Sequence, residues 1–243
     1  MLETFKNILD IFIVPIAPAY CGLCGECIDS LSLGKACRGC WSSTRIFKGD
    51  EALCPKCGRY LVGQRLSLVS GCRLCRGHLY DAAISCGIYE YGLAVSVIHL
   101  KTESHIPVAL RTVIESRLDQ NNEIVGELLI PVPLSRGRFF ERGFNQAEVI
   151  ARLVGRLSSK AVDSKSLVRR GNTGMHRVAM DRTARKKSVE GIFSVVRPKM
   201  IDGKHVTLID DVLTSGATLS ACAAELKKAG ARRVTAFTIA RTR

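Results

Sequence analysis

The chain has 243 residues, of which 47% are hydrophobic and 24% charged, with 36 basic and 22 acidic side chains. This composition supports a substantial buried core, so it excludes a disordered chain and a mini-protein. The excess charge is uneven, because residues 1–135 hold 13 basic and 13 acidic residues whereas residues 136–187 hold 14 and 4. Positive charge concentrated in this way predicts an anionic partner: phosphates on a small molecule, a nucleic acid, or both.

The N-terminal segment is apolar over residues 8–20, but Pro15 and Pro18 interrupt it. Tyr20 is too large for a signal-peptide cleavage position before Cys21, and no apolar run reaches the roughly 18 residues that a membrane helix needs. We therefore expect a cytoplasmic protein with no membrane span, whose first twenty residues pack on the domain. A signal peptide is the alternative.

Cysteines dominate the region that follows, since 9 of the 11 lie between Cys21 and Cys75. Eight of them form four pairs with two intervening residues: Cys21/Cys24, Cys37/Cys40, Cys54/Cys57 and Cys72/Cys75. In a reducing compartment this spacing is typical of zinc ligands, and Gly25 and Gly58 supply the positive φ that a zinc knuckle needs. The repeat predicts two structural Zn²⁺ sites in tandem zinc ribbons.

The spacing leaves the pairing of the cysteines open. Sequential ribbons are preferred over an interleaved cross-brace, and a redox switch is a further alternative for the whole module. Cys27 has the same spacing to Cys24 as Cys21 has, although the glycine rule favours Cys21. We expect Cys27, Cys86 and Cys222 to be small buried hydrophobic residues.

A short buried strand is predicted over Leu128–Val132, followed by Pro133, an arginine-rich loop and a helix from about residue 145 to 157. The loop contains Arg136, Arg138 and Arg142. The planar guanidinium suits phosphate oxygens, so this cluster is a candidate phosphate contact, with solvated surface charge as the alternative.

The most informative segment runs from Val206 to Leu219. Four largely apolar residues predict a buried strand over Val206–Ile209, which the acidic pair Asp210 and Asp211 ends. A loop of small residues, Thr214, Ser215, Gly216, Ala217 and Thr218, leads into a helix predicted from Leu219 to Ala229. A strand, a small-residue loop and a helix N-terminus together form a phosphate cradle at the carboxyl end of the strand.

The two carboxylates beside this cradle need hydroxyls or a cation as partners, and a phosphorylated ribose supplies the hydroxyls. The segment resembles the phosphoribosyl-pyrophosphate (PRPP) motif of type I phosphoribosyltransferases. A generic nucleotide-binding loop is the alternative. Thr214 stands where 6-oxopurine transferases have an aspartate, which argues against purine salvage of that kind.

Further motifs narrow the resemblance. The R-G-F-N-Q run after P-V-P, the cysteine module and the L-I-D-D-V segment are together similar to the ComF family of competence-associated, phosphoribosyltransferase-like proteins, including its GntX-type members. The resemblance extends to residues 89–101, an aromatic strand followed by a helix and Lys101. It implies an α/β fold with a parallel sheet flanked by helices, with residues 1–80 forming the N-terminal segment and double zinc ribbon and residues 81–243 the transferase-like domain.

The resemblance also implies a function and a site. The protein is expected to bind PRPP with Mg²⁺, to act as a pentosyl transferase, and to serve DNA uptake beside competence-machinery proteins. The implied catalytic residues are Asp210, Asp211, Arg142, Arg177 and Arg185. The implied PRPP-binding residues are Thr214, Ser215, Gly216, Ala217, Thr218, Arg136 and Arg138.

The basic segment 167–195 corresponds to the mobile catalytic loop of that fold, with His176 and Ser188 where the family usually has glutamine and asparagine. Two alternative functions stay open: an accessory protein that binds single-stranded DNA, and a PRPP sensor without transferase activity. Aromatic residues make up only 6% of the chain, which is few stacking platforms for a single-strand binder.

Overall fold

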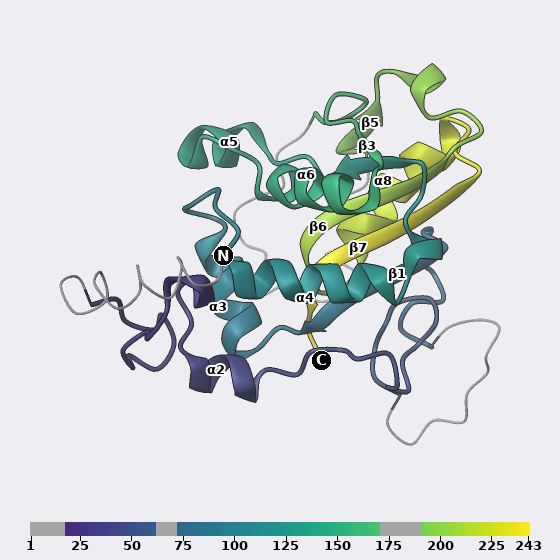
Figure 1. The fold of residues 1–243 in the computed structure, drawn as a ribbon. Helices are drawn as coiled ribbons and strands as arrows, with labels where there is room; N and C mark the ends of the chain where they lie inside the picture. The colour runs from purple at the N-terminus through teal and green to yellow at the C-terminus, as the bar shows by residue number, and fades with distance from the viewer. Residues whose placement is uncertain (1–17, 62–71, 171–190) are drawn as a thin grey trace.

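The computed structural model describes residues 18–61, 72–170 and 191–243 (Figure 1). The expected packing of the first twenty residues therefore falls almost wholly outside the described residues. The helices of the described chain are η1 Leu31–Leu33, α2 Arg38–Ser43, α3 Tyr91–His99, α4 Val108–Asp119, η2 Asn122–Ile124, α5 Arg136–Arg142, α6 Gln146–Ser158, η3 Pro198–Met200 and α8 Ala217–Lys228. The strands are β1 Ala82–Ile88, β2 Leu128–Pro131, β3 Ala161–Val162, β4 Leu167–Arg169, β5 Phe193–Val195, β6 His205–Leu213 and β7 Arg233–Arg241.

A parallel sheet forms the centre of the molecule, in the order β1-β7-β6-β2-β3. The order reverses between β6 and β2, because β6 leads through α8 to β7 while β2 leads through α6 to β3. Open α/β sheets bind ligands beyond the carboxyl ends of their strands at such a reversal. The predicted α/β class with a parallel sheet is confirmed.

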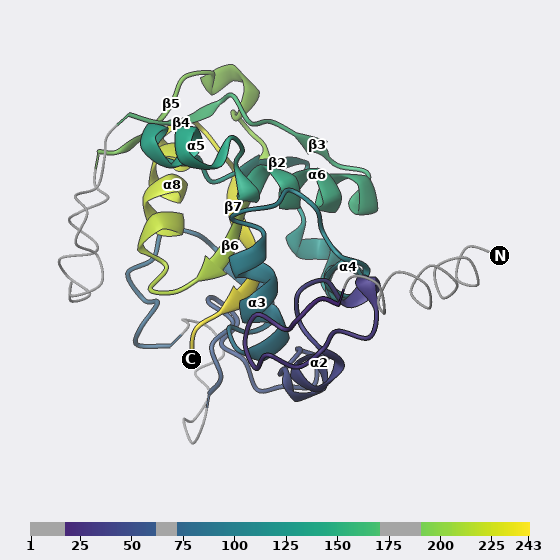
Figure 2. The same ribbon diagram turned by 90° about the vertical axis from the view of Figure 1, so that its left-hand side faces the viewer.

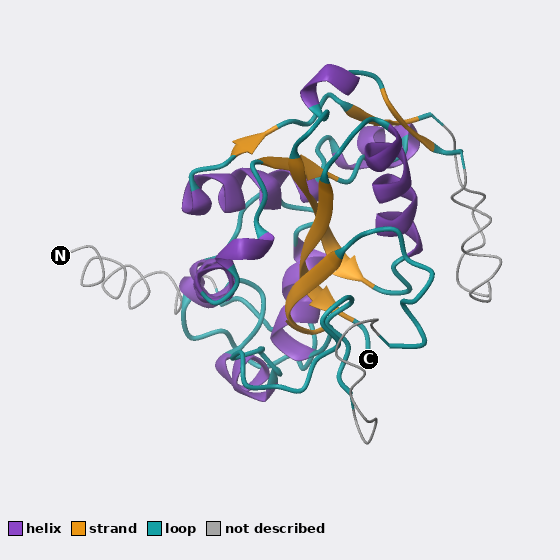
Figure 3. Ribbon diagram, turned by 90° about the vertical axis from the view of Figure 1, so that its right-hand side faces the viewer, coloured by secondary structure: helices purple, strands orange, loops and turns teal. Residues whose placement is uncertain are grey.

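Two cores cover the two faces of the sheet, since successive side chains of a strand point to opposite faces. Val206 and Leu208 face one core, which α8 covers, whereas Ile209 faces the other, which α3, α4 and α6 cover. The layers are visible from two opposite sides in Figures 2 and 3. Both faces are buried, which explains why the strands are nearly continuous apolar runs.

Several elements differ from their predicted bounds. β6 extends to Leu213 because β7 pairs with it as far as Arg241, so the acidic pair lies within the strand rather than after it. The predicted arginine-rich loop contains a helix, α5, which Ser135 caps at its start and Gly143 ends with φ 74°. α8 begins at Ala217, two residues earlier than predicted.

The cysteine-rich segments pack directly on this sheet and its helices. Cys37 and Cys40 share a small core with Val95 of α3, whereas Cys54, Cys57 and Cys75 are buried in the same core as β6 and α8. The division at residues 80 and 81 stays a prediction. Among the described residues, no helix is long and apolar enough to cross a membrane.

Candidate functional site

The acidic pair lies at the carboxyl end of β6, beside the point where the strand order reverses. Asp210 and Asp211 are both partly buried. The Oδ1 atom of Asp210 accepts the N–H of Asp211 at 2.9 Å, and the Oδ1 atom of Asp211 accepts the N–H of Val212 at 2.8 Å. These bonds orient the carboxylates and leave the second oxygen of each available to other groups.

Three segments far apart in the sequence meet at Asp211. Lys101, which follows α3, places Nζ 4.0 Å from Oδ2 of Asp211. Gln146 at the start of α6 donates to the same oxygen at 3.5 Å, and its own Oε1 accepts from Nη1 of Arg142 at 2.9 Å. The structure therefore brings the predicted Arg142 to the acidic pair through Gln146.

Burial and the adjacent charge of Asp211 raise the pKa of Asp210 well above its ordinary value. Tyr89, which follows β1, also interacts with the charge of Asp211. Burial is the larger cause, and the charge of Asp211 the smaller one, of the raised pKa of its phenol. Asp210 therefore binds a proton more readily than an isolated aspartate does, and a ligand that supplies positive charge or hydroxyl donors would displace it.

The predicted phosphate loop joins β6 to α8. Gly216 is the N-cap of α8 with φ 75°, and as a glycine it supplies no capping side chain of its own. Ser215 Oγ accepts the N–H of Ala217 at 3.5 Å. The first-turn N–H groups of a helix have no intrahelical partner, so this end of α8 offers donors to an anion, as the sequence predicts for Thr214–Thr218.

The other predicted arginines are not joined to the acidic pair by any described contact. Arg136 and Arg138 lie on α5, where every side chain is exposed or half-buried, and neither forms an ion pair within the part of the chain that the structure describes. Arg177 and Arg185, with the rest of the predicted catalytic loop, lie outside the described residues. The ends of that segment, β4 and β5, form an antiparallel pair.

The eight predicted cysteines gather into two groups of four thiols. The first cluster is Cys21, Cys24, Cys37 and Cys40, and the second is Cys54, Cys57, Cys72 and Cys75, with all sulfurs of a cluster within 4.8 Å of one another. The pairs thus combine in sequential order, not as a cross-brace.

The sulfur positions suit a tetrahedral ion. Sγ atoms are 3.7 Å apart for Cys21 and Cys40, and 3.6 Å apart for Cys57 and Cys72. A tetrahedral site with metal–sulfur bonds of about 2.3 Å requires about 3.8 Å between sulfurs. Gly25 and Gly58 have φ of 78° and 65°, which confirms the predicted left-handed knuckle positions. Both clusters fit a bound metal ion.

The three remaining cysteines differ in their burial. Cys86 and Cys222 are buried and free, as predicted, and burial raises the pKa of the Cys86 thiol to about 12. The expectation that Cys27 is buried is wrong, because this thiol is exposed and lies outside the first cluster. The structure therefore selects Cys21 over Cys27 as a potential ligand.

Several known proteins are similar to this chain in sequence. Residues 142–243 match the phosphoribosyl transferase domain family, a region that includes the acidic pair and the phosphate loop. The DNA utilization protein YhgH of Escherichia coli strain K12 is 28% identical over 229 residues, which cover 91% of this chain and 97% of that protein. The chain is thus similar to this protein over nearly its whole length.

Two further relatives are named competence proteins. The competence protein ComFC of Bacillus subtilis strain 168 is 28% identical over 86% of this chain and 85% of its own length. The competence protein F of Haemophilus influenzae is 24% identical over 90% of this chain and 96% of its own length. The predicted resemblance to ComF proteins is confirmed, and residues 142–243 are similar to a phosphoribosyltransferase domain.

A solved structure of the glutamine PRPP amidotransferase from B. subtilis, complexed with ADP and GMP, is 17% identical with a TM-score of 0.38. That match covers 58% of this chain and 30% of the other. Its similarity is too low to carry an argument about this chain.

Proposed function

We propose that this chain binds PRPP and transfers its phosphoribosyl group, and that it acts in DNA uptake. The observation that carries the proposal is the carboxylate pair at the reversal of strand order, with the N-terminus of α8 a few residues further on. The names of the competence and DNA-utilization relatives support the role in DNA uptake.

Each part of the site has a chemical task in this proposal. Asp210 and Asp211 accept hydrogen bonds from the two ribose hydroxyls, and the N–H groups of Thr214–Thr218 hold the 5-phosphate at the positive end of α8. Gln146 orients Asp211 by its hydrogen bond. Together they fix C1 of the ribose relative to the phosphate loop.

Carboxylate oxygens are the donors that Mg²⁺ prefers, so Asp210 and Asp211 fit an ion that arrives with PRPP. When bound, Mg²⁺ neutralises charge on the pyrophosphate. Asp210 loses its proton as this positive charge and the ribose hydroxyls approach.

The transfer breaks the C1–O bond, and pyrophosphate leaves with the electron pair while the acceptor forms the new bond to C1. Positive side chains stabilise the charge that develops on the leaving group. Lys101 lies beside Asp211, and Arg142 is linked to it through Gln146, so both are proposed for this task. Arg136, Arg138, Arg177 and Arg185 are further proposed contacts.

Calorimetry with PRPP and Mg²⁺ tests the binding step. The unmutated protein should bind, Asp210→Asn/Asp211→Asn should lose binding, and Asp119→Asn, an exposed acid at the end of α4, should bind normally. Failure of the unmutated protein to bind would reject the proposal. Release of pyrophosphate with a panel of acceptors then separates a transferase from a PRPP sensor, which binds without releasing it.

Zn²⁺ is the proposed ion of both cysteine clusters, because it favours four thiolates in tetrahedral geometry. The clusters replace part of the apolar core that short loop-rich segments cannot build. Atomic absorption should find about two zinc ions per chain, and none in protein unfolded with a chelator. A chain purified without any bound metal would contradict this part of the proposal.

Binding of single-stranded DNA is a second candidate, which the surface of α5 favours. This exposed helix carries Phe139 and Phe140, 48% and 83% exposed, between Arg138 and Arg142. Exposed aromatic rings beside arginines can stack bases while the guanidiniums contact phosphates. Two of the few aromatic residues of the chain therefore lie on a surface where they could stack on the bases of a single strand.

The test is an oligonucleotide titration at several salt concentrations. Phe140→Ala should weaken binding roughly five- to 100-fold, the range expected for loss of one stacked base. Ile98→Ala, which removes another exposed apolar side chain, is the matched control. Affinity that does not fall as salt rises would exclude binding through the phosphate backbone.

A further inference from the structure

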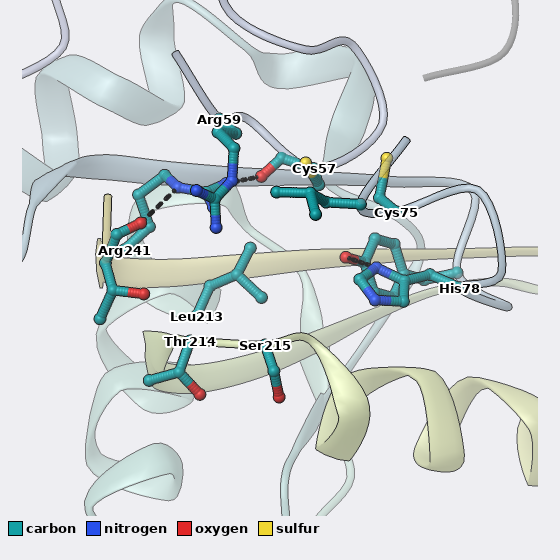
Figure 4. A pocket seen from close by; sticks show the side chains of 11 residues that line it. Cys57, Arg59, Cys75, His78, Leu213, Thr214, Ser215 and Arg241 are labelled. Atoms are coloured by element: carbon teal, nitrogen blue, oxygen red, sulfur yellow. Dashed lines mark hydrogen bonds between the residues drawn. The ribbon is translucent and has the colours of Figure 1, made fainter. Parts of the chain in front are cut away.

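Residues 76–81, which we call the connecting segment, join the second cysteine cluster to the start of β1. The N–H of His78 donates to the carbonyl of Cys75 at 3.0 Å, so the segment leaves the cluster in a tight turn. Figure 4 shows His78 between Cys75 and the loop that carries Thr214 and Ser215. The position of the second cluster therefore fixes where this segment begins.

The connecting segment fills the space beside Gly216 of the phosphate loop. A β-carbon added to Gly216 would lie 2.6 Å from Cε1 of His78 and 2.9 Å from the hydroxyl of Tyr80. Tyr80 is fully buried, and its hydroxyl lies 2.5 Å from Nδ1 of His78, so the two rings are held as a pair. They lie directly against the residue at which α8 begins.

Two further contacts fasten the connecting segment along α8. The N–H of Leu79 donates to Oγ of Ser220, in the first turn of the helix, at 3.0 Å. Asp81 accepts from Nζ of Lys227, near the end of the helix, at 2.6 Å, and from the N–H of Val234 of β7 at 2.8 Å. The segment therefore follows the helix whose N-terminus is the proposed phosphate site.

The first cluster contacts a different element. Its buried thiols share a core with Val95 of α3. Thr44, which follows α2, accepts the N–H of Gly92 at 2.8 Å and donates to the carbonyl of Cys40 at 2.7 Å. The first cluster is thus tied to the start of α3, and it provides an internal control for any effect of the second.

A metal ion in the second cluster would hold the turn from which the connecting segment starts, because sites of this kind fold the short segments that supply their ligands. Without an ion, the four thiols have no common centre, and His78 loses its fixed position beside Gly216. The N–H groups at the start of α8 must then be ordered by the ligand itself. Ordering them on binding costs conformational entropy, which weakens the affinity.

We propose that the metal ion of the second cluster controls ligand affinity at the phosphate loop, and that His78 is the positioning residue that transmits this control. The inference rests on the proposed function, because it names the regulation of that same site. Coupling between two binding sites is reciprocal, so PRPP must raise the affinity for the metal by the factor by which the metal raises the affinity for PRPP. We expect a factor of about ten or more, which corresponds to ordering one or two loop residues.

Two measurements on the zinc-loaded full chain test both directions of the coupling. Calorimetry with PRPP and Mg²⁺ should show an affinity at least tenfold lower after Zn²⁺ is removed by a chelator that prefers it to Mg²⁺. Transfer of Zn²⁺ to a chromogenic chelator should show that PRPP protects one of the two ions by the same factor and leaves the other unaffected. Cys40→Ser should keep the protected ion. The second readout requires no transferase activity.

Variants of the connecting segment test the route of the effect. His78→Ala should retain both ions but reduce the coupling factor to less than about twofold. Ser220→Ala removes only the hydroxyl that holds the N–H of Leu79, and it should lower the coupling as well. His105→Ala removes an exposed imidazole before α4 and is the matched control, with full coupling expected. A merely structural role of His78 would lower thermal stability without changing the coupling factor.

The outcomes separate the two proposals. Equal PRPP affinity in the loaded and stripped chain, or protection of Zn²⁺ that His78→Ala leaves unchanged, would overturn the inference and retain the proposed function. A chain that binds no PRPP would reject the proposed function, and the same coupling is then measured with inorganic phosphate, the ligand of the loop alone. Phosphate that protects one Zn²⁺ ion would support the inference by itself. A loop that binds neither ligand would reject both proposals.

Discussion

The two cysteine clusters are built alike, from two pairs of cysteines with two intervening residues, although 12 residues separate the pairs of the first cluster and 14 those of the second. Their surroundings differ. The first packs its buried thiols against Val95 of α3 in a small core that the sheet does not share. The second is buried in the core of β6 and α8, and its following segment lies against the phosphate loop. A β-carbon added to Gly216 would lie 2.6 Å from Cε1 of His78. Similar cysteine motifs therefore pack against a helix in one place and beside the predicted phosphate loop in another.

Loss of one cluster at a time is the strongest way to break this comparison. Cys75→Ser should remove one metal ion, lower the free energy of unfolding by about 4 kcal/mol or more, and abolish PRPP binding, since the phosphate loop loses its outer wall. Cys40→Ser should also remove one ion but leave PRPP affinity within twofold. Metal analysis, thermal unfolding and calorimetry measure the three quantities. Equal loss of PRPP affinity in both variants would contradict the distinction.

The two regions can also be compared through one glycine in each, because the two glycines have nearly equal φ angles. Gly216 and Gly25 have φ of 75° and 78°. Alanine at Gly25 meets nothing within 4 Å and should cost about 1 kcal/mol for the positive φ. Alanine at Gly216 must also displace His78 and the Tyr80 hydroxyl, so it should cost about 3 kcal/mol. Urea unfolding of both variants checks the difference. Equal midpoints would show that His78 and Tyr80, which follow the second cysteine cluster, do not restrict the phosphate loop.

Substitution of Asp210 tests whether the candidate ligand site lowers the stability of the folded chain. Its folded pKa is raised, first by burial, so its contribution to stability is fully present below the ordinary value of 3.8 and is lost as pH rises through the folded pKa. Asp210→Asn should therefore stabilise the chain by about 1 kcal/mol at pH 8, or about 3 °C in Tm, while losing PRPP binding. At pH 4 the gain should be smaller. Thermal unfolding at both pH values measures it, and a gain that is the same at both would reject the explanation.

The smallest expected difference concerns surface ion pairs of the two regions. Arg38 and Asp29, beside the first cluster, are 3.0 Å apart with 74% and 53% of their side chains exposed. Lys227 of α8 and Asp81, beside the second module, are 2.6 Å apart and less exposed, and Asp81 also accepts the N–H of Val234. Arg38→Ala should cost at most about 0.3 kcal/mol and Lys227→Ala about 0.5–1 kcal/mol. Denaturant unfolding at low and high salt measures both, and a larger cost for Arg38→Ala would reverse the order.

Local patterns predicted much of the fold and of the candidate site. Pairs of cysteines two residues apart, followed by Gly25 and Gly58, specify their own turns, so both clusters could be predicted. The strand, acidic pair and small-residue loop from Val206 to Thr218 are also contiguous. The helix α5 was missed altogether because its signals, a Ser135 cap and Gly143 at its end, frame only 7 residues.

The sequence by itself determined the cysteine knuckles, the phosphate loop and the parallel class of sheet, because each depends on residues close together in the chain. Only the tertiary structure brought Lys101 and Gln146 to Asp211, and Arg241 beside Cys57. These contacts span 110, 65 and 184 positions, and they arise because parallel strands end at one edge of the sheet. No local pattern records which distant side chains that edge will gather.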